Sequence, residues 1–206
     1  ERPEMLAELL SPWIAPEELT IERQAVYRFH ARCCSRFQLD HTFLIGDAAH
    51  ITPPFVGQGL VAGLRDAANL AWKLAWVIKK QARPRILMSY DQERRPHANQ
   101  MINLAKMMGQ LVMPRNRPRA MAIHGAMRAL NLIPPARSYL EELKIKPANC
   151  FKQGLFKPGS RMGNLHSGAQ LPQDYIRQND SICLSDDALG DALTLVGLGV
   201  DPCLGL

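Results

Sequence analysis

The sequence lacks any apolar run long enough to cross a membrane. A membrane-spanning helix needs about 20 consecutive apolar residues, and the best candidate, residues 70–78, is short and interrupted by Lys73. The sequence also lacks a basic-then-apolar signal peptide at its start, and its five cysteines include no C-x-x-C pair. We therefore expect a cytoplasmic protein with no membrane contact, no disulfide framework and no zinc site.

Acidic residues are scarce in the middle of the chain. Residues 79–161 hold 17 Lys and Arg against 4 Asp and Glu, whereas the whole chain of 206 residues carries a net charge of only +6. Such a basic region can attract nucleic acid, but it lacks the interleaved aromatic residues of a single-strand-binding surface. We favour the interpretation that these basic residues lie on solvated helix faces and meet an acidic partner surface, and we expect no nucleic-acid partner.

The apolar pattern predicts an α/β chain that is mostly helical. Residues 4–10 favour a short helix, and residues 20–37 a strand-like segment. Residues 42–45 form an apolar run typical of a strand buried on both faces of a parallel sheet. A long helix is predicted from Gly59 until Pro84 ends it. The apolar stripe that faces the core is expected at positions 60, 64, 67, 71, 74 and 78. The opposite, polar side of the helix is expected to carry Arg65, Asp66, Asn69, Lys73 and Lys80.

Two further helices and a loop-rich tail are predicted to follow. The second helix covers residues 86–112, with a kink or break near Arg95 because Pro96 lies inside the pattern. The third covers residues 119–130. After Pro147 regular periodicity fades, with some strand or short-helix potential over residues 184–198. The aspartates there do not follow the spacing of an EF-hand, so a solvated turn is favoured over a calcium site.

Residues 46–59 combine several features that suit ligand binding. They read GDAAHITPPFVGQG and follow the predicted strand, at the end where open α/β sheets bind ligands. Gly46 permits close approach to the backbone. Asp47 can accept hydrogen bonds from ligand hydroxyls, although a role as a cap or turn residue is equally open. Gly57 and Gly59 precede a helix whose free N–H groups favour an anion.

This segment matches G-D-x-x-H-x-x-x-P-x-x-G-x-G at each fixed position and resembles the second FAD signature of flavin-dependent aromatic hydroxylases, the para-hydroxybenzoate hydroxylase group. The similarity continues through residues 63–74 and 90–97, which look most like the 3-(3-hydroxyphenyl)propionate hydroxylase branch. The resemblance implies a Rossmann-like FAD-binding domain. It also implies a monooxygenase that uses FAD, NADH or NADPH, and oxygen to hydroxylate a small phenolic substrate through a flavin C4a-hydroperoxide.

The resemblance also implies roles for individual residues. Asp47 would hydrogen-bond the ribityl or pyrophosphate region, while Leu60 and Val61 would donate backbone N–H groups to the flavin. Pro54 would lie beside the ring with its carbonyl near the reacting hydroxyl, and Phe55 would touch the flavin or the substrate. The implied cofactor-binding set is Gly46, Asp47, Ala48, Pro54, Gly57, Gln58, Gly59, Leu60 and Val61.

Nearby charged residues are interpreted structurally. His50 could serve as an acid or base, but a structural hydrogen bond is favoured for it. Arg65 and Asp66 are expected to form surface or inter-element ion pairs, and residues 93–95 a structural network. No metal site is predicted.

The family's G-x-G-x-x-G fingerprint, which binds the ADP half of FAD, is missing. Because the first residue is Glu1 and not Met, we expect the C-terminal portion of a larger flavoenzyme. Residues 1–38 would end a substrate-binding region, 39–135 would complete the FAD-binding domain, and 136–206 would be a linker and the start of a thioredoxin-like domain. The chain alone is expected to be inactive and to self-associate or depend on the missing part. The alternatives are a flavin halogenase or reductase, or a non-catalytic remnant with an assembly role.

Overall fold

A computed structural model of the chain describes residues 25–134 without interruption. Outside this range it describes residues 5, 8, 10–15, 18, 20, 22–23, 147, 149–156, 159, 161–163, 165–178, 180–190, 193–194 and 196. The helices are α2 (Gly59–Ile78), α3 (Met88–Val112), α4 (Arg117–Asn131) and the short α6 (Ser185–Leu189). Three 3-10 helices connect other elements: η2 (Gly46–Ala48), η3 (Pro54–Val56) and η4 (Pro84–Leu87).

The strands within the described residues form four small antiparallel pairs. They are β1 (Arg32–Cys33) with β4 (His50–Ile51), β2 (Gln38–Leu39) with β3 (Thr42–Phe43), β5 (Arg161–Met162) with β6 (Leu165–His166), and β7 (Tyr175–Gln178) with β8 (Ser181–Leu184). The fold is therefore a mixture of helices and small sheets, as expected in broad terms.

Two of the predicted strands are wrong in detail. Of residues 20–37, only β1 is a strand, and Val26, Tyr27 and Phe29 are more than 60% exposed on extended, unpaired backbone. The run at 42–45 is not a buried central strand, because β3 pairs with β2 in a tight hairpin and Ile45 is 43% exposed. Burial on both faces needs parallel neighbours, and the described part of the chain supplies none.

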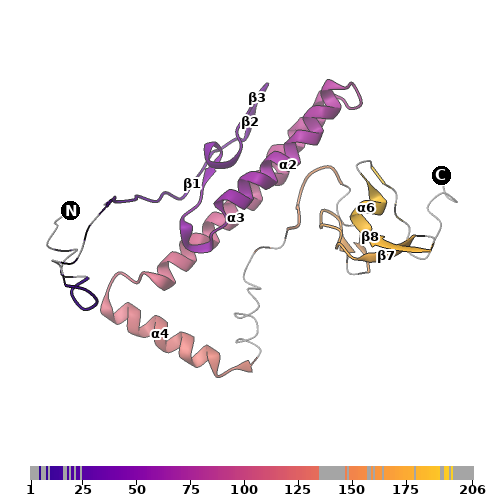
Figure 1. Cartoon of the computed structure of the whole chain (residues 1–206). Helices are drawn as coiled ribbons and strands as arrows, with labels where there is room; N and C mark the ends of the chain where they lie inside the picture. Colours follow the sequence, from indigo (N-terminus) through magenta and orange to yellow (C-terminus); the bar gives the residue numbers. More distant parts are fainter. Residues whose placement is uncertain are drawn as a thin grey trace.

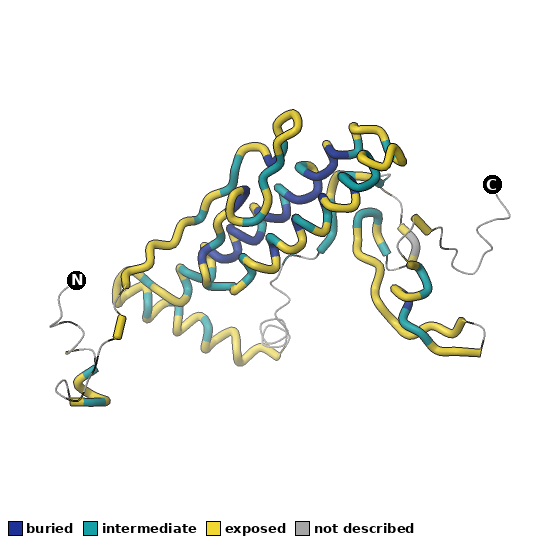
Figure 2. The backbone as a smooth tube through the Cα atoms, turned by 45° about the horizontal axis from the view of Figure 1, so that its top comes forward, coloured by how far each residue is buried: buried dark blue, intermediate teal, exposed yellow. Residues whose placement is uncertain are grey.

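Helices α2 and α3 lie side by side and carry most of the buried residues (Figures 1 and 2). The apolar core between them and the β2–β3 hairpin is small, and it contains Phe37, Ala49, Leu70, Leu87, Tyr90 and Ala98. Tyr90 also donates a hydrogen bond from its hydroxyl to the Leu44 carbonyl oxygen at 2.7 Å. The side chain of Asp91 accepts the Phe37 N–H at 2.8 Å. The start of α3 therefore holds the chain that leads into residues 46–59.

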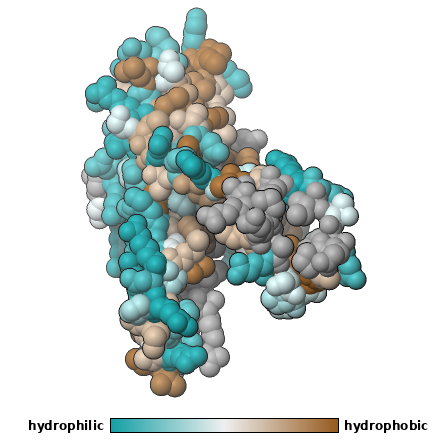
Figure 3. Space-filling view, turned by 90° about the vertical axis from the view of Figure 1, so that its left-hand side faces the viewer, coloured by the Kyte–Doolittle hydropathy of each residue, from teal (hydrophilic) through white to brown (hydrophobic). Residues whose placement is uncertain are grey.

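The predicted core stripe of α2 is wrong at four of its six positions, although Leu74 does pack against the core. Leu60, Leu64 and Ile78 are 78%, 61% and 77% exposed, while Asp66 and Lys73 are fully buried. The helix spans the predicted residues, but it turns its charged side toward α3, where partners neutralise both charges. Apolar patches interleave with hydrophilic ones on the surface seen in Figure 3.

Helix α3 runs without a break through Pro96, so of the predicted kink or break near Arg95 the break is not found. A proline in a helix interior removes a hydrogen bond and typically costs about 3 kcal/mol. Packing offsets that cost here, because Glu93, Arg94, His97 and Ala98 on either side of Pro96 are all buried.

The remaining elements largely follow the sequence pattern. Helix α4 confirms the predicted helix at 119–130, and its N-cap Asn116 accepts the Arg119 N–H at 3.1 Å. Helix α6 falls in the segment 184–198 expected to hold short elements and replaces the turn expected at Asp186 and Asp187, whereas β8 precedes that segment and shares only Leu184 with it. The predicted helix at 4–10 lies largely outside the described residues. Within the part of the chain that the structure describes, no helix combines the length and hydropathy that crossing a membrane requires.

Candidate functional site

A hollow of about 730 Å³ opens where residues 46–59 meet the start of α2. Six of the nine residues expected to bind a cofactor line it: Gly46, Asp47, Pro54, Gly57, Gly59 and Leu60. The other three, Ala48, Gln58 and Val61, do not form its wall. Phe29, Ile45, Ile51 and Leu64 add apolar surface. The hollow therefore combines a mostly apolar wall with one carboxylate and the end of a helix.

Within the described residues, no side chain caps the N-terminus of α2. The Gln58 side chain makes no capping hydrogen bond, and the first turn contains no acidic residue. The first backbone bond of the helix runs from Ala62 N–H to the Gln58 carbonyl oxygen at 2.9 Å. The N–H groups of residues 59–61 therefore have no backbone acceptor in the described chain and remain available to a ligand.

Asp47 lies in the middle of η2 and is exposed to the hollow. Its carboxylate has no hydrogen-bond partner among the described residues, and η2 has no side-chain cap. The alternative role as a cap is therefore not seen, whereas Asp47 does lie in a 3-10 turn, as the alternative role of turn residue predicts. A charged acceptor with no protein partner is free to receive hydroxyl donors from a ligand.

Two glycines bring the η2 turn against α2. Gly46 has a left-handed φ of 55°, which favours glycine. A Cβ added to Gly63 would lie only 3.2 Å from the Gly46 Cα. The sequence shows Gly63 only as a small residue in a helix, so its contact with the motif was not predicted.

Phe55 does not line the hollow. Its ring packs on Gly109 of α3, where an added Cβ would lie 2.5 Å from the Phe55 Cε2. The structure thus directs the ring toward α3, whereas contact with a flavin or substrate was expected. Gly109 leaves the space that this ring fills and so helps to hold η3 in place.

Gly109→Ala is expected to cost about 1–3 kcal/mol of unfolding free energy, because the new methyl group overlaps the Phe55 ring. Urea unfolding followed by circular dichroism measures the change. Gly125→Ala in α4 is the matched control. It meets no atom within 4 Å and should be neutral or stabilising. Equal effects of the two changes would contradict the packing described for Phe55.

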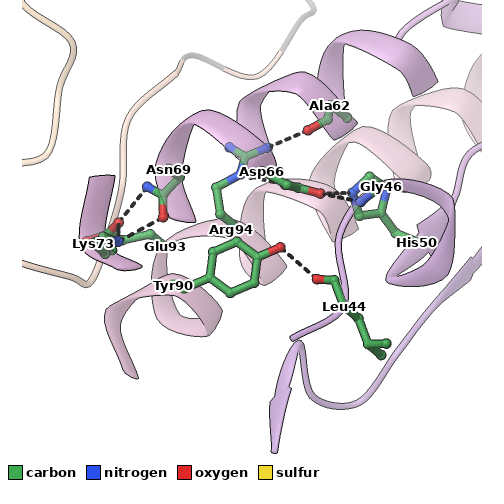
Figure 4. Close-up of polar contacts among 10 residues, drawn as sticks. All are labelled: Leu44, Gly46, His50, Ala62, Asp66, Asn69, Lys73, Tyr90, Glu93 and Arg94. Atoms are coloured by element: carbon green, nitrogen blue, oxygen red, sulfur yellow. Dashed lines mark hydrogen bonds and ion pairs between the residues drawn. The ribbon is translucent and has the colours of Figure 1, made fainter. Parts of the chain in front are cut away.

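A buried ionic cluster joins the η2 segment to both long helices (Figure 4). Asp66 of α2 accepts hydrogen bonds at Oδ2 from Gly46 N–H at 3.1 Å and from His50 Nε2 at 2.7 Å. Its Oδ1 accepts from Arg94 Nε at 2.7 Å. All three side chains are at most 2% exposed. The structural role expected for His50 and the inter-element ion pair expected for Asp66 are both confirmed.

The pKa of Asp66 is shifted below its ordinary value. Burial alone would raise it, but hydrogen bonds from His50, Arg94 and Gly46 and the charge of Arg94 overcome that effect. The carboxylate is therefore ionised at neutral pH, and it accepts from each of its neighbours.

A second buried ion pair lies further along the same helices. Lys73 donates to Glu93 at 2.6 Å and to Asn69 at 2.8 Å, and burial lowers the pKa of Lys73. Glu93 also accepts the Asn69 amide at 2.8 Å and the Leu155 N–H of the tail at 3.0 Å. The network expected for residues 93–95 is confirmed, but this pair makes no contact with residues 46–59.

No group of three or more residues suited to hold a metal ion is found in the described part of the chain. His97 of α3 is another buried titratable group near Arg94. Burial, followed by the charges of Arg94 and Arg65, lowers its pKa to about 4. Neither of its ring nitrogens has a hydrogen-bond partner within the described residues.

Comparison with known proteins places this geometry in a family. The profile described as "FAD binding domain" matches residues 4–105. A "3-(3-hydroxy-phenyl)propionate/3-hydroxycinnamic acid hydroxylase" from Comamonas testosteroni is 43% identical over 172 residues, which are 83% of this chain and 29% of that protein. Over residues 4–105, the chain belongs to the FAD binding domain family.

A second relative in this family covers nearly the whole chain. The "3-(3-hydroxy-phenyl)propionate/3-hydroxycinnamic acid hydroxylase 2" of Burkholderia vietnamiensis is 36% identical over 203 residues, 98% of this chain and 37% of that protein. The matched residues thus span only 29% and 37% of the lengths of these two relatives. The similarity to this branch of the flavin-dependent aromatic hydroxylases, expected from residues 63–74 and 90–97, is confirmed.

Solved structures of two other proteins share this fold. OxyS anhydrotetracycline hydroxylase from Streptomyces rimosus aligns with a TM-score of 0.60 and 29% identity, over 75% of this chain and 30% of its own. The flavin-dependent monooxygenase PieE, solved with FAD and substrate, aligns with a TM-score of 0.65 over 92% of this chain and 39% of its own. At 19% identity, PieE supports the fold alone.

Proposed function

We propose that this FAD binding domain family member holds the ribityl chain and flavin ring in a monooxygenase that hydroxylates a small phenolic compound. One observation carries the proposal. The uncapped N-terminus of α2 and the unpartnered Asp47 carboxylate face the same largely apolar hollow. Both features suit the cofactor, because FAD offers a flat apolar ring, a polyhydroxyl chain and a ring edge that becomes anionic on reduction.

Each part of the hollow has a role in this proposal. Asp47 accepts hydrogen bonds from the ribityl hydroxyls. The N–H groups of Leu60 and Val61, at the positive end of the α2 dipole, stabilise negative charge on the ring edge. Pro54 lies beside the ring, and Gly57 and Gly59 keep side chains out of its approach. Gly46, Ala48 and Gln58 complete the proposed cofactor-binding set as the neighbours that hold Asp47 and the start of α2 in place.

FAD, when bound, supplies the redox chemistry that passes electrons from NADH or NADPH to oxygen and one oxygen atom to the phenol. The residues of this chain bind and orient the cofactor, and the α2 N-terminus provides electrostatic stabilisation. The names of the 36–43% identical relatives support phenolic acids as the substrate class. NADH oxidation that a phenol stimulates, with formation of a hydroxylated product, tests the reaction. A halogenated product or none would contradict it.

Asp47→Ala is expected to weaken FAD binding by about ten- to a hundredfold. Loss of a charged hydrogen-bond partner typically costs about 1.5–3 kcal/mol, which corresponds to that range. Titration of the intact apoprotein with FAD, followed by quenching of flavin fluorescence, measures the affinity. Asp180→Ala, at an exposed position in the turn between β7 and β8, is the control and should leave the affinity unchanged. Unchanged affinity in Asp47→Ala would refute the assignment.

A further inference from the structure

We infer that Asp66 is a positioning residue for the FAD site, acting through the η2 turn although it lies outside the hollow. This inference rests on the proposed function, because it assigns to Asp66 the task of orienting Asp47. Asp66 does not itself line the hollow and makes no hydrogen bond to Asp47; it is fully buried, and it reaches the wall only through its hydrogen bond with Gly46. Its effect on a ligand must therefore pass through the residues that it binds.

The hydrogen bonds of Asp66 bracket Asp47. Gly46 lies one residue before Asp47 and His50 three residues after it, and both donate to the same oxygen, Oδ2, at 3.1 and 2.7 Å. The turn that carries Asp47 is thus held at both ends by one atom of α2 (Figure 4). His50 is itself fixed in β4, opposite Cys33 of β1.

Arg94 prevents the carboxylate of Asp66 from rotating. Its Nε donates to Oδ1 at 2.7 Å, and its Nη2 lies 3.4 Å from the Ala62 carbonyl oxygen. Each carboxylate oxygen of Asp66 therefore has its own hydrogen-bond partners, and the carboxylate cannot rotate without breaking at least one of these bonds. His50 must carry its proton on Nε2 to donate to the ionised carboxylate.

Helix packing alone does not require this arrangement. Replacing a buried ion pair with apolar residues of similar size is often neutral or stabilising, because charges lose their hydration on burial. The Lys73–Glu93 pair already joins the same two helices. What the Asp66 cluster adds is a set of directional bonds to the η2 segment. The close contact between Gly46 and Gly63 fixes the distance of the turn from α2, and the hydrogen bonds fix its rotation.

Asp66→Asn and Glu93→Gln form a matched pair of variants that tests this inference. Each changes one buried acid on the α2–α3 interface into its amide, and each leaves a buried cation without its full counter-charge. Both should lower the melting temperature. Asp66→Asn should raise the Kd for FAD at least tenfold in the intact protein and change the shape of the bound flavin absorption band. Glu93→Gln should change the Kd less than threefold and leave the band unaltered.

A second pair of variants decides the question if Asp66→Asn does not fold. Gln at position 50 can still donate to Asp66 from its amide nitrogen, whereas Leu cannot. His50→Gln should therefore keep the Kd within about threefold of the wild type, and His50→Leu should raise it tenfold or more.

The outcomes separate the two hypotheses. If the wild-type protein does not bind FAD, the proposed function fails and the inference falls with it. If the wild type binds FAD but Asp66→Asn and Glu93→Gln raise the Kd equally, or His50→Leu behaves like His50→Gln, the proposed function stands and Asp66 is a structural residue only.

Discussion

Arg94→Met should reduce the free energy of unfolding by about 3–5 kcal/mol, the usual cost of removing one partner from a buried ion pair. The reason is that Asp66, fully buried, would keep its charge but lose the guanidinium 2.7 Å away. Protonation of Asp66 would relieve part of this cost, so the loss should be smaller at acid pH. Urea unfolding at pH 7, with the midpoint and the slope compared separately, measures the effect.

The neighbouring arginine provides the control for this prediction. Arg95 forms an i,i+4 pair with Asp91 at 3.1 Å, and its side chain is 37% exposed. Exposed pairs of this kind contribute about 0.3–0.5 kcal/mol, so Arg95→Met should change stability by less than about 1 kcal/mol. A loss below 1 kcal/mol in Arg94→Met as well would show that the buried cluster does not hold the helices together.

The second large effect is a loss of stability in mild acid caused by His97. Its pKa in the folded protein is about 4, against about 6.5 when it is exposed. Between these values the unfolded chain binds the proton and the folded protein does not, so stability falls as the pH is lowered. The contribution of His97 is complete above about pH 6.5 and is lost on approach to pH 4. The shift corresponds to about 3 kcal/mol.

His97→Leu isolates this contribution from that of the carboxylates. Because neither ring nitrogen of His97 has a partner within the described residues, Leu leaves no broken hydrogen bond in that part of the protein. Unfolding free energies of the two proteins are compared at pH 7 and pH 4.5. The wild type should lose more stability over this interval by up to about 3 kcal/mol. Parallel losses in both proteins would contradict the assigned pKa.

The positions of the helices could be predicted from the sequence, but not the faces that they bury. Helices α2 and α4 begin and end within a few residues of the pattern. On α2, however, a regular stripe of apolar residues is exposed while Asp66 and Lys73 are buried. Their partners, Arg94 and Glu93, lie 28 and 20 residues away along the chain, and hydrophobic periodicity contains no information about such pairs. The sequence did contain one signal for these pairs. Asp66 and Lys73 lie seven residues apart on α2, and their partners of opposite charge are adjacent on α3.

The candidate site was predictable where the motif itself forms it. Six of the nine residues expected to bind a cofactor lie around one hollow, because the glycines and prolines of the motif fix the local backbone; that they bind a cofactor stays a prediction. Gly63 and Gly109 were not predicted as supports, since a small residue in a helix does not reveal what packs on it. The packing of Phe55 on α3 was not predicted for the same reason, and its contact with a flavin or substrate stays a prediction. Its ring occupies the space above Gly109, a position 54 residues away in the sequence.

The contacts of α3 make its length less tolerant of change than its composition. Tyr90 binds Leu44, Glu93 binds the tail at Leu155, and Arg94 binds Asp66. Each added residue turns a helix by about 100°. One residue inserted between Tyr90 and Glu93 would therefore leave α3 helical but aim these groups in incompatible directions. Insertions and deletions should consequently be confined to the loops at either end of α3, while many single substitutions on its exposed side are accepted.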